Sequence, residues 1–538
     1  MTRLRNWLSA WLPLFLFASG LVVAAAEPTC PPSSKASACI QQAVDTLTPN
    51  GGVIRLSAGE YILDTPLQLN RDSITLEGVG STTVLKRGVL VENGEGVVNV
   101  RAKRITLRGF RFDGDVLEPT GIPYVDPVNE FSVHGAPIYS NPMHPELLRN
   151  TGITIHGNTS NVRLEDLEIQ HTGGYAILID ARYGSISNVE MRRLHLRDNR
   201  PHLFGNPNDL RYGSWTGGIH YQNDGRDLEF ARHALRGLTI EDSTFERISG
   251  HAIWGHGYGF QTLNEDVVIR RCQFTDIGLD GVLIGNTRRA VVEHNHFHRI
   301  GYTPRNGGGR PRPAWFPGFR EDRADNIPAV GIDTSGLVSE SVYQGNTMLN
   351  VNGNCIDLDG FTRGDVLHNS MQVSGRADAW NYINDLVDEF GPAQVGNYTK
   401  GINLSNTAGA TLTESVRIVG NTIMNLGGYG IFLYDSQRCL VEDNHIRHYS
   451  LIFPPIILAN SLREPQAVHQ SRENIVRNNY VYFYPNVQCI GEADDIGDGD
   501  LPVVGPNYVY ANTCDQNRDD QFLPGKQSGS RDARPPTP

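Results

Sequence analysis

Lysine is scarce in this sequence. Only five of its 47 basic residues are lysine, at positions 35, 86, 103, 400 and 526, and the net charge is −12. Binding to nucleic acid requires a basic face, so this balance argues against a nucleic-acid partner. It argues only weakly against an anionic glycan, because the charge of a local patch can differ from the total.

Long apolar runs are absent after the first 26 residues. Arg3 and Arg5 precede an apolar stretch over residues 7–23, and three alanines at 24–26 offer a cleavage site. This pattern predicts a signal peptide over residues 1–26. A membrane anchor is disfavoured because the stretch is short and is broken by Pro13 and Gly20. We therefore expect a secreted or periplasmic product with no membrane association after cleavage.

The chain has only seven cysteines, a number that fits an oxidising compartment. Cys30 with Cys39, and Cys489 with Cys514, are placed to form two disulfides. The remaining three lie inside repeat units and are expected to be small buried hydrophobes: Cys272, Cys355 and Cys439. A catalytic cysteine is disfavoured, because none has a histidine and a carboxylate at a telling position.

Glycine is abundant at 57 residues and the hydrophobic fraction is a modest 39%, which favours many short strands and turns over helices. A short motif recurs in which apolar residues flank an asparagine. Asn346 and Asn369 lie 23 residues apart, as do Asn421 and Asn444. A period of about 22 to 25 residues is typical of a solenoid. We interpret the recurring asparagines as a structural ladder in a tight turn that uses left-handed backbone.

Short runs with alternating apolar residues lie between the asparagines. Nine of them align on their first buried residue: Ile177, Ile219, Ile253, Val282, Ile332, Ile356, Ile402, Ile431 and Ile457. Strands this short cannot bury a face alone, so they must stack as parallel sheets with neighbouring coils. The start of the chain differs, because residues 38–47 form an amphipathic helical pattern ahead of the first strands.

The repeat and the leading helix together resemble the pectate-lyase-like superfamily of right-handed parallel β-helices, over about residues 40 to 510. The resemblance implies an all-β solenoid with an N-terminal capping helix, and enzymes such as polygalacturonases and polysaccharide lyases. We expect one domain over residues 27–523 and a disordered tail over 524–538, which is rich in Ser, Arg and Pro.

Four long inserts interrupt the coils, at about 114–150, 200–216, 303–328 and 376–399. Each falls just before an aligned strand, so the inserts should form a wall along one face. Aromatic residues in them, Trp315 among the arginines of the third insert, suit contacts with sugars. Long loops of this kind usually carry function.

Acidic residues gather at the outward positions of the middle strands. Asp333 and Asp357 stand one residue after the aligned apolar position, with Asp359 and Asp280 close by. Stacked carboxylates repel, so at least one should hold a proton at neutral pH, and a paired acid and base is what glycoside hydrolysis needs. The spacing leaves retaining and inverting mechanisms open. The alternatives are turn caps or a Ca²⁺ site.

Other polar and aromatic residues share these outward rows. His220, His251, His256, Lys400 and Asn403 are candidates to hold sugar hydroxyls or tune the carboxylates, and Trp254 is a candidate sugar platform, as is Trp315.

The comparison with polygalacturonases is incomplete. Asp280, His251 and Lys400 occupy offsets comparable to motif residues of that family, but their order differs, and its Asp-Asp position reads Asn354-Cys355. The resemblance therefore extends to fold and general class and not to a pectin substrate.

The sequence thus predicts an exported glycoside hydrolase that cleaves a polysaccharide, needs no cofactor and holds no catalytic metal, with Ca²⁺ as the alternative. A polysaccharide lyase is the second reading, with Lys400, His220 or His251 as the base. A non-catalytic glycan-binding surface protein is the third. The oligomeric state is left open.

Overall fold

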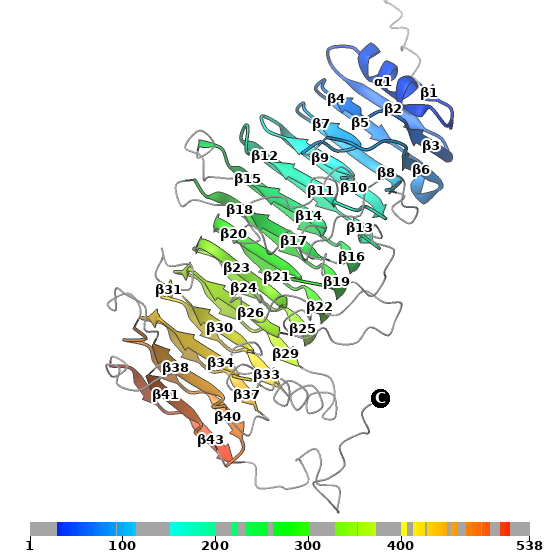
Figure 1. Cartoon of the computed structure of the whole chain (residues 1–538). Coiled ribbons are helices and arrows are strands. Elements are labelled where there is room, and N and C mark those ends of the chain that lie inside the picture. The colour runs from blue at the N-terminus through cyan, green and yellow to red at the C-terminus, as the bar shows by residue number, and fades with distance from the viewer. Residues whose placement is uncertain are drawn as a thin grey trace, which may run out of the picture.

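The computed structural model describes residues 29–92, 94–114, 151–199, 217–223, 232–248, 250–256, 262–301, 329–351, 353–372, 400–405, 413–424, 428–448, 453–460, 470–485, 487–494 and 506–516. Short parallel strands stack coil upon coil along one long axis (Figure 1). The expected right-handed parallel β-helix is confirmed. All four inserts, the signal peptide and the tail after residue 516 lie outside the described residues.

Each coil contributes strands to three parallel sheets. The sheet that carries the candidate site, called the site sheet, consists of β4 (Leu67–Leu69), β7 (Val98–Val100), β9 (Ile153–His156), β11 (Tyr175–Asp180), β14 (Gly217–Gln222), β17 (His251–His256), β20 (Val282–Arg288), β23 (Ala329–Ser339), β26 (Gly353–Asp359), β30 (Ile402–Ser405), β34 (Ile431–Tyr434), β38 (Ile456–Asn460) and β41 (Ile490–Asp494).

The second sheet follows in each coil. It consists of β1 (Thr29–Cys30), β2 (Gly52–Leu56), β5 (Ile74–Glu77), the first parts of β8 (Ile105–Asp113) and β10 (Ser160–Gln170), β12 (Ile186–Arg192), β15 (Leu235–Glu241), β18 (Asn264–Arg270), β21 (Val291–Glu293), β24 (Val342–Gln344), β28 (Asp365–Leu367), β32 (Arg417–Val419), β36 (Leu440–Glu442), β39 (Ile475–Arg477) and β42 (Tyr508–Tyr510).

The third sheet completes each coil. It consists of β3 (Gly59–Leu63), β6 (Thr83–Arg87), the second parts of β8 and β10, β13 (His195–Arg197), β16 (Thr244–Ile248), β19 (Gln273–Ile277), β22 (His296–Ile300), β25 (Thr347–Val351), β29 (Ser370–Gln372), β33 (Thr422–Met424), β37 (His445–Arg447), β40 (Tyr480–Phe483) and β43 (Thr513–Gln516). Three two-residue strands, β27 (Phe361–Thr362), β31 (Thr413–Glu414) and β35 (Ser436–Gln437), pair beside the site sheet.

The expected capping helix is present. Helix α1 (Ala36–Thr46) covers the first coil and buries Ile40, Ala43 and Val44. The disulfide between Cys30 and Cys39 ties it to β1. The helix therefore shields the apolar core at this end of the solenoid from water.

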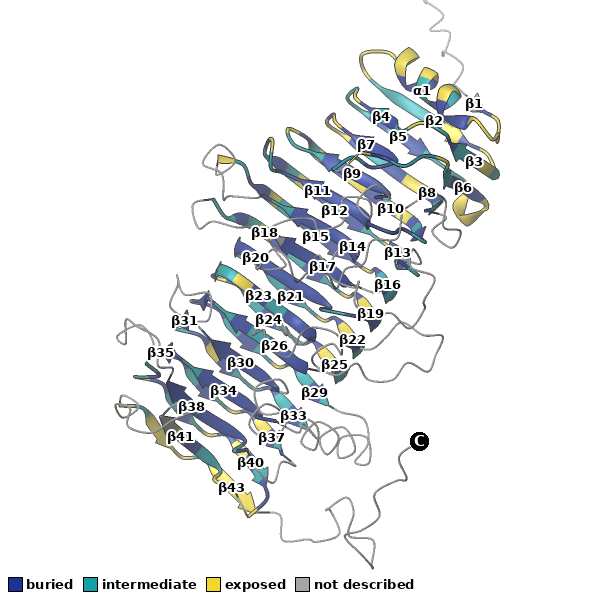
Figure 2. Ribbon diagram, viewed as in Figure 1, coloured by how far each residue is buried: buried dark blue, intermediate teal, exposed yellow. Residues whose placement is uncertain are grey.

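Inward side chains form continuous rows in the core. Phe245, Phe274 and Phe297 stack on successive coils with ring centroids 4.8 and 4.6 Å apart, which matches the spacing of neighbouring strands. The strands are buried along most of their length, and exposure is concentrated in the turns and at the two ends (Figure 2). The register of the coils is therefore fixed by packing of identical or similar side chains.

The recurring asparagines form a buried ladder, as expected. Along the ladder, the side-chain Nδ2 of each asparagine donates to the side-chain Oδ1 of the next one at 2.9–3.0 Å. The members are Asn295, Asn346, Asn369, Asn421, Asn444, Asn479 and Asn512. The expected left-handed backbone is displaced by one residue, because His294, His368 and Asp443 immediately before the ladder have positive φ. The asparagines remain free to orient inward, where they satisfy buried main-chain groups.

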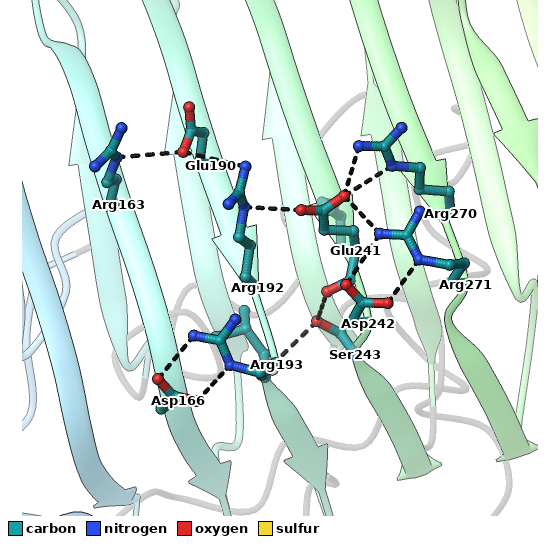
Figure 3. Close-up of polar contacts among 12 residues, drawn as sticks. Arg163, Asp166, Glu190, Arg192, Arg193, Glu241, Asp242, Ser243, Arg270 and Arg271 are labelled. Carbon is teal, nitrogen blue, oxygen red and sulfur yellow. Dashed lines mark hydrogen bonds and ion pairs between the residues drawn. The ribbon is translucent and has the colours of Figure 1, made fainter.

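A second ladder, of ion pairs, runs on the outside of the second sheet. Glu241 accepts contacts from Arg192, Arg270 and Arg271 of neighbouring coils, and Arg193 pairs with Asp166 one coil before it (Figure 3). Glu241 is buried, with 7% of its side chain exposed, whereas the arginines and Asp166 are 36–53% exposed. The exposed pair of Arg193 with Asp166 contributes little by itself. The alternation of sign along this ladder from coil to coil avoids like-charge repulsion between stacked positions.

Candidate functional site

Most of the candidate residues lie on the strands of the site sheet or directly before them, in rows set by strand register. Eight of the nine aligned positions are observed partners in sequence order, from Ile177 to Ile431. The ninth is wrong by one residue, because Ile456 pairs with Ile431 and Ile457 with Phe432. Because Ile456 and Ile457 are both apolar, the apolar–polar pattern does not show which of the two side chains points into the core. The row also extends to Ile153 and Val98, two coils that the alignment did not include.

Asp333 of β23 and Asp357 of β26 are direct partners across adjacent strands. Neighbouring strands are about 4.8 Å apart, so the two carboxyl groups leave consecutive rungs on the same face. Asp359 lies two residues beyond Asp357 and shares this face, and all three are half-buried. The structure thus brings together three of the four aspartates that the sequence proposed.

Asp280 is different, because it is fully buried. One carboxyl oxygen accepts the main-chain N–H of Val330 at 2.8 Å, and the other lies 2.8 Å from Nδ1 of His251. Both oxygens are thus engaged by the protein, and the side chain does not reach the outer surface. The prediction that Asp280 is one of the catalytic carboxylates on the outward face needs correction, because Asp280 is a buried group behind Asp333.

Asp357 is held by two amide groups. Asn354 Nδ2 donates to one carboxyl oxygen and Asn403 Nδ2 to the other, both at 2.7 Å. Asn354 lies three residues earlier on the same strand, and Asn403 is the partner of Asp357 on β30. Two donors aimed at the two oxygens favour the ionised carboxylate.

Lys400 joins this network of hydrogen bonds through Asn403. Its Nζ donates to Oδ1 of Asn403 at 3.0 Å and lies 4.1 Å from the ring centroid of Phe432. The side chain is buried at 6% exposure. Burial lowers the pKa of Lys400 to about 8, and the nearby charge of Asp357 limits the fall. The lysine therefore acts on Asp357 through Asn403 and through its charge.

The two facing aspartates have different electrostatic surroundings. Removal from water raises the pKa of Asp333 well above its usual range, and the charges of Asp280 and Asp357 raise it further. Burial also raises the pKa of Asp357, but Lys400 and the amide of Asn403 oppose this rise. Asp333 is therefore the member of the pair that keeps its proton to higher pH.

The coils before the acidic centre carry rings that pack on one another. Trp254 lies between His220, at 4.5 Å with an edge contact, and His251, at 4.9 Å, while Tyr175 stacks on His220 at 4.5 Å. Trp254 is only 3% exposed. The expectation of an open sugar platform at Trp254 therefore needs correction, because neighbouring rings cover it. His220 and His251 are buried too, and their rings pack against that of Trp254.

Two of the predicted site residues have no described side chain. Trp315 lies outside the described residues, as does the side chain of His256. The glycine before His256 has a packing reason, because a Cβ at Gly255 would lie 2.2 Å from the hydroxyl of Tyr221. The glycine at position 255 is therefore explained by packing of the core and not by chemistry.

Sequence reasoning missed the role of Asn354. It was noted only as a departure from an Asp-Asp motif, yet its amide is one of the two donors to Asp357. The only signal in the sequence was its closeness to Asp357, three residues later; strict strand alternation would place the two residues on opposite faces, so the pattern alone does not predict their contact. Phe432, whose ring centroid lies 4.1 Å from Nζ of Lys400, is a second contact of the site that the sequence did not indicate.

The described residues contain no group of three or more His, Cys, Asp or Glu side chains arranged to hold a metal ion. Two disulfides are formed as expected, and the other three cysteines are free and buried. Within the same parts of the chain, none of the helices has the length and apolar character that crossing a membrane requires.

One protein-family model matches the middle of the chain. The family described as "Right handed beta helix region" matches residues 120–304 and 212–382. These matches agree with the right-handed parallel β-helix that the strands of this chain form. No curated protein sequence matches it.

Among solved structures, a surface adhesin of Streptococcus pneumoniae, PfbA, is 13% identical, with 89% of each chain covered and a TM-score of 0.45. An exopolygalacturonase from Thermotoga maritima is 12% identical, with 90% of each chain covered and a TM-score of 0.38. The A-module of a mannuronan C-5 epimerase of Azotobacter vinelandii is 14% identical, covering 91% of this chain and 97% of its own, with a TM-score of 0.32. At these identities the likeness concerns the fold alone.

Proposed function

We propose that this protein is an exported glycoside hydrolase that cleaves a polysaccharide bound along the site sheet. One observation carries the proposal: Asp333 and Asp357 face each other on adjacent strands in unlike environments. Pairs of titratable groups whose surroundings push their pKa values apart are typical of acid and base pairs in enzymes.

The surroundings of Asp333 and Asp357 support a different role for each. Asp333 has the more strongly raised pKa, so it is the general acid that protonates the glycosidic oxygen as the bond to the sugar breaks. Asp357 accepts two amide hydrogen bonds, so it is the carboxylate that acts as base on water or as nucleophile. Asp359 shares their face and would contact the sugar beside the scissile bond.

The buried groups around the pair act as positioning residues. Asn354 and Asn403 orient Asp357, and Lys400 fixes Asn403. The charge of Asp280 behind Asp333 raises the pKa of Asp333, which favours the protonated acid. No metal ion is required for these steps, and we propose that turnover proceeds without one.

The test is a product screen. Purified mature protein is incubated with neutral and uronate-containing polysaccharides, with and without chelator, and new reducing ends are measured together with near-ultraviolet absorbance. New reducing ends without absorbance, lost in Asp357→Asn, would support the hydrolase. Intact polymers throughout, with measurable binding, would contradict it in favour of a glycan-binding protein.

A polysaccharide lyase is the second candidate, because Lys400 is buried beside Asp357 with a pKa of about 8. A lysine of that pKa can serve as a base that removes the proton α to a uronate carboxylate. The hydrogen bond of its Nζ to Asn403 and its seat on the ring of Phe432 favour a fixed cation instead. Unsaturated products that absorb in the near ultraviolet, lost in Lys400→Met, would establish the lyase.

A further inference from the structure

The last two described coils of the solenoid expose a group of tyrosines far from the acidic pair. Tyr480, Tyr508 and Tyr510, called the tyrosine patch, are 40%, 54% and 48% exposed. Exposed ribbon marks this end of the molecule around β41 and β43 (Figure 2). The described residues include only two other large apolar or aromatic side chains exposed to this degree besides Val509 of the same strand: Val79 and Tyr183.

The geometry of the patch follows from the register of the last strands. Tyr508 and Tyr510 lie two residues apart on β42, so both point outward about 6.6 Å from each other. Tyr510 is the partner of Arg477 on β39, and Tyr480 follows three residues after that arginine. The patch therefore wraps the corner between the second and third sheets, on a different side of the coil from the site sheet.

Polar contacts hold two of the tyrosines in place. Tyr510 Oη accepts from Nη1 of Arg477 at 3.2 Å, and Tyr480 Oη donates to Oδ2 of Asp515 at 2.8 Å. The ring of His445 lies 5.0 Å from that of Tyr480. The disulfide between Cys489 and Cys514 ties down the residue next to Asp515. Aromatic rings anchored in this way lose little conformational freedom when a ligand binds.

The charges of the patch are paired among themselves. Nε of Arg477 lies 2.7 Å from Oε1 of Glu442, and Oδ2 of Asp515 accepts a hydrogen bond from Oη of Tyr480. The patch thus presents ring surface and hydrogen-bonding groups with little net charge, although the whole chain carries −12. This balance matches a neutral, polyhydroxylated ligand and neither a polyanion nor a basic partner.

The end of the solenoid is poorly suited to a protein strand. Glu492 and Gln516 stand in rows that are apolar on the preceding coil, where their partners are Leu458 and Phe483. Adding a strand from another chain would bury the charge of Glu492, and inward charges at an edge are a known barrier to such pairing. The exposed tyrosines point sideways from this edge and stay accessible.

We propose that the tyrosine patch is a second binding site, for the pyranose rings of a neutral polysaccharide, distinct from the acidic centre. The last strand of the site sheet, β41, is four strand spacings beyond β26, about 19 Å along the axis. Such a site would hold the polymer on the protein without taking part in bond cleavage. The proposal does not depend on which reaction the acidic pair performs.

The test is affinity electrophoresis of the full mature chain in gels that contain soluble neutral polysaccharides, such as β-glucan, xylan, mannan and galactan. We expect at least one to retard the protein. The double variant Tyr508→Ala/Tyr510→Ala should bind about tenfold more weakly or worse, as loss of buried aromatic contacts implies. The matched variant Tyr508→Phe/Tyr510→Phe, which keeps the rings, should bind within about twofold of wild type. Asp357→Asn should bind normally, which separates this site from the proposed hydrolase.

Three results would overturn the proposal. They are no retardation of the wild type by any neutral polysaccharide, equal retardation of the alanine variant, and a wild-type dimer in light scattering that the alanine variant abolishes. Thermal unfolding of each variant checks that the last coil remains folded. An alanine variant that unfolds early is replaced by Tyr508→Ser alone, where unchanged binding again counts against the site.

Discussion

Replacing Asn403 by leucine removes one of the two donors to Asp357 while keeping the volume of the side chain. The lost hydrogen bond joins Asn403 Nδ2 to a carboxyl oxygen at 2.7 Å. A hydrogen bond to a charged group contributes about 1.5–3 kcal/mol, and one pKa unit corresponds to about 1.36 kcal/mol. Loss of the donor disfavours the ionised form, so the pKa of Asp357 rises. Because the base must be ionised, we expect the acidic limb of the kcat/KM profile to move up by about one to two pH units.

The assay is the pH dependence of hydrolysis on the polysaccharide identified in the product screen. Asn354→Leu removes the other donor and should move the same limb in the same direction. Thr154→Val serves as the control, because Thr154 is buried in the same outward row several coils away. An acidic limb that stays in place in both leucine variants, with full activity, would refute the assignment of Asp357 as the base.

Further predictions concern the acidic pair, the ladder and metal dependence. Asp333→Asn and Asp357→Asn should each lower kcat by about 10²–10⁴-fold, measured by reducing ends, while circular dichroism stays unchanged; full activity in either would contradict its role. The folded-state pKa of Asp333 is raised, so its stabilising contribution is complete below pH about 4 and is lost as pH rises through that pKa. Asp333→Asn should therefore gain in melting temperature relative to wild type between pH 4 and pH 8, and a constant difference in calorimetry would count against a raised pKa. Asn369→Leu breaks buried contacts to Asn346, Asn421 and the carbonyl of Tyr343, and should lower the free energy of unfolding by about 3 kcal/mol or more in urea titrations; a loss under about 1 kcal/mol would show that the ladder is dispensable. Chelator should leave turnover unchanged, and a loss restored by Ca²⁺ would instead favour the calcium interpretation of the acidic rows.

Strand register on the site sheet was predictable from the sequence because each coil repeats one pattern. Parallel stacking has a side-chain period of two, so a single aligned residue such as Ile332 or Ile356 fixes which neighbours face outward. That is why the sequence alone predicts that Asp333 and Asp357 are partners on adjacent strands. The same reasoning failed at Ile456 and Ile457, where two adjacent apolar residues fit either phase. Alternation determines register only where polar and apolar residues differ.

The roles of individual side chains depended on the tertiary structure. Asp280 and Asp333 look alike in the sequence, yet one is fully buried against His251 and Val330 and the other stands half-buried on the face. Trp254 reads as a sugar platform until its ring is seen packed between two histidines. Burial and hydrogen-bond geometry are set by contacts between coils, and a linear pattern does not specify them.

The sequence by itself therefore determined the solenoid, its capping helix, both disulfides and the rows in which the polar residues stand. These features follow from local periodicity and from the near-constant spacing of stacked strands. Only the tertiary structure decided that Asn354 and Asn403 donate to Asp357 and that burial and nearby charge raise the pKa of Asp333. Those properties arise from distances of a few ångströms between residues of different coils, where desolvation and charge act together.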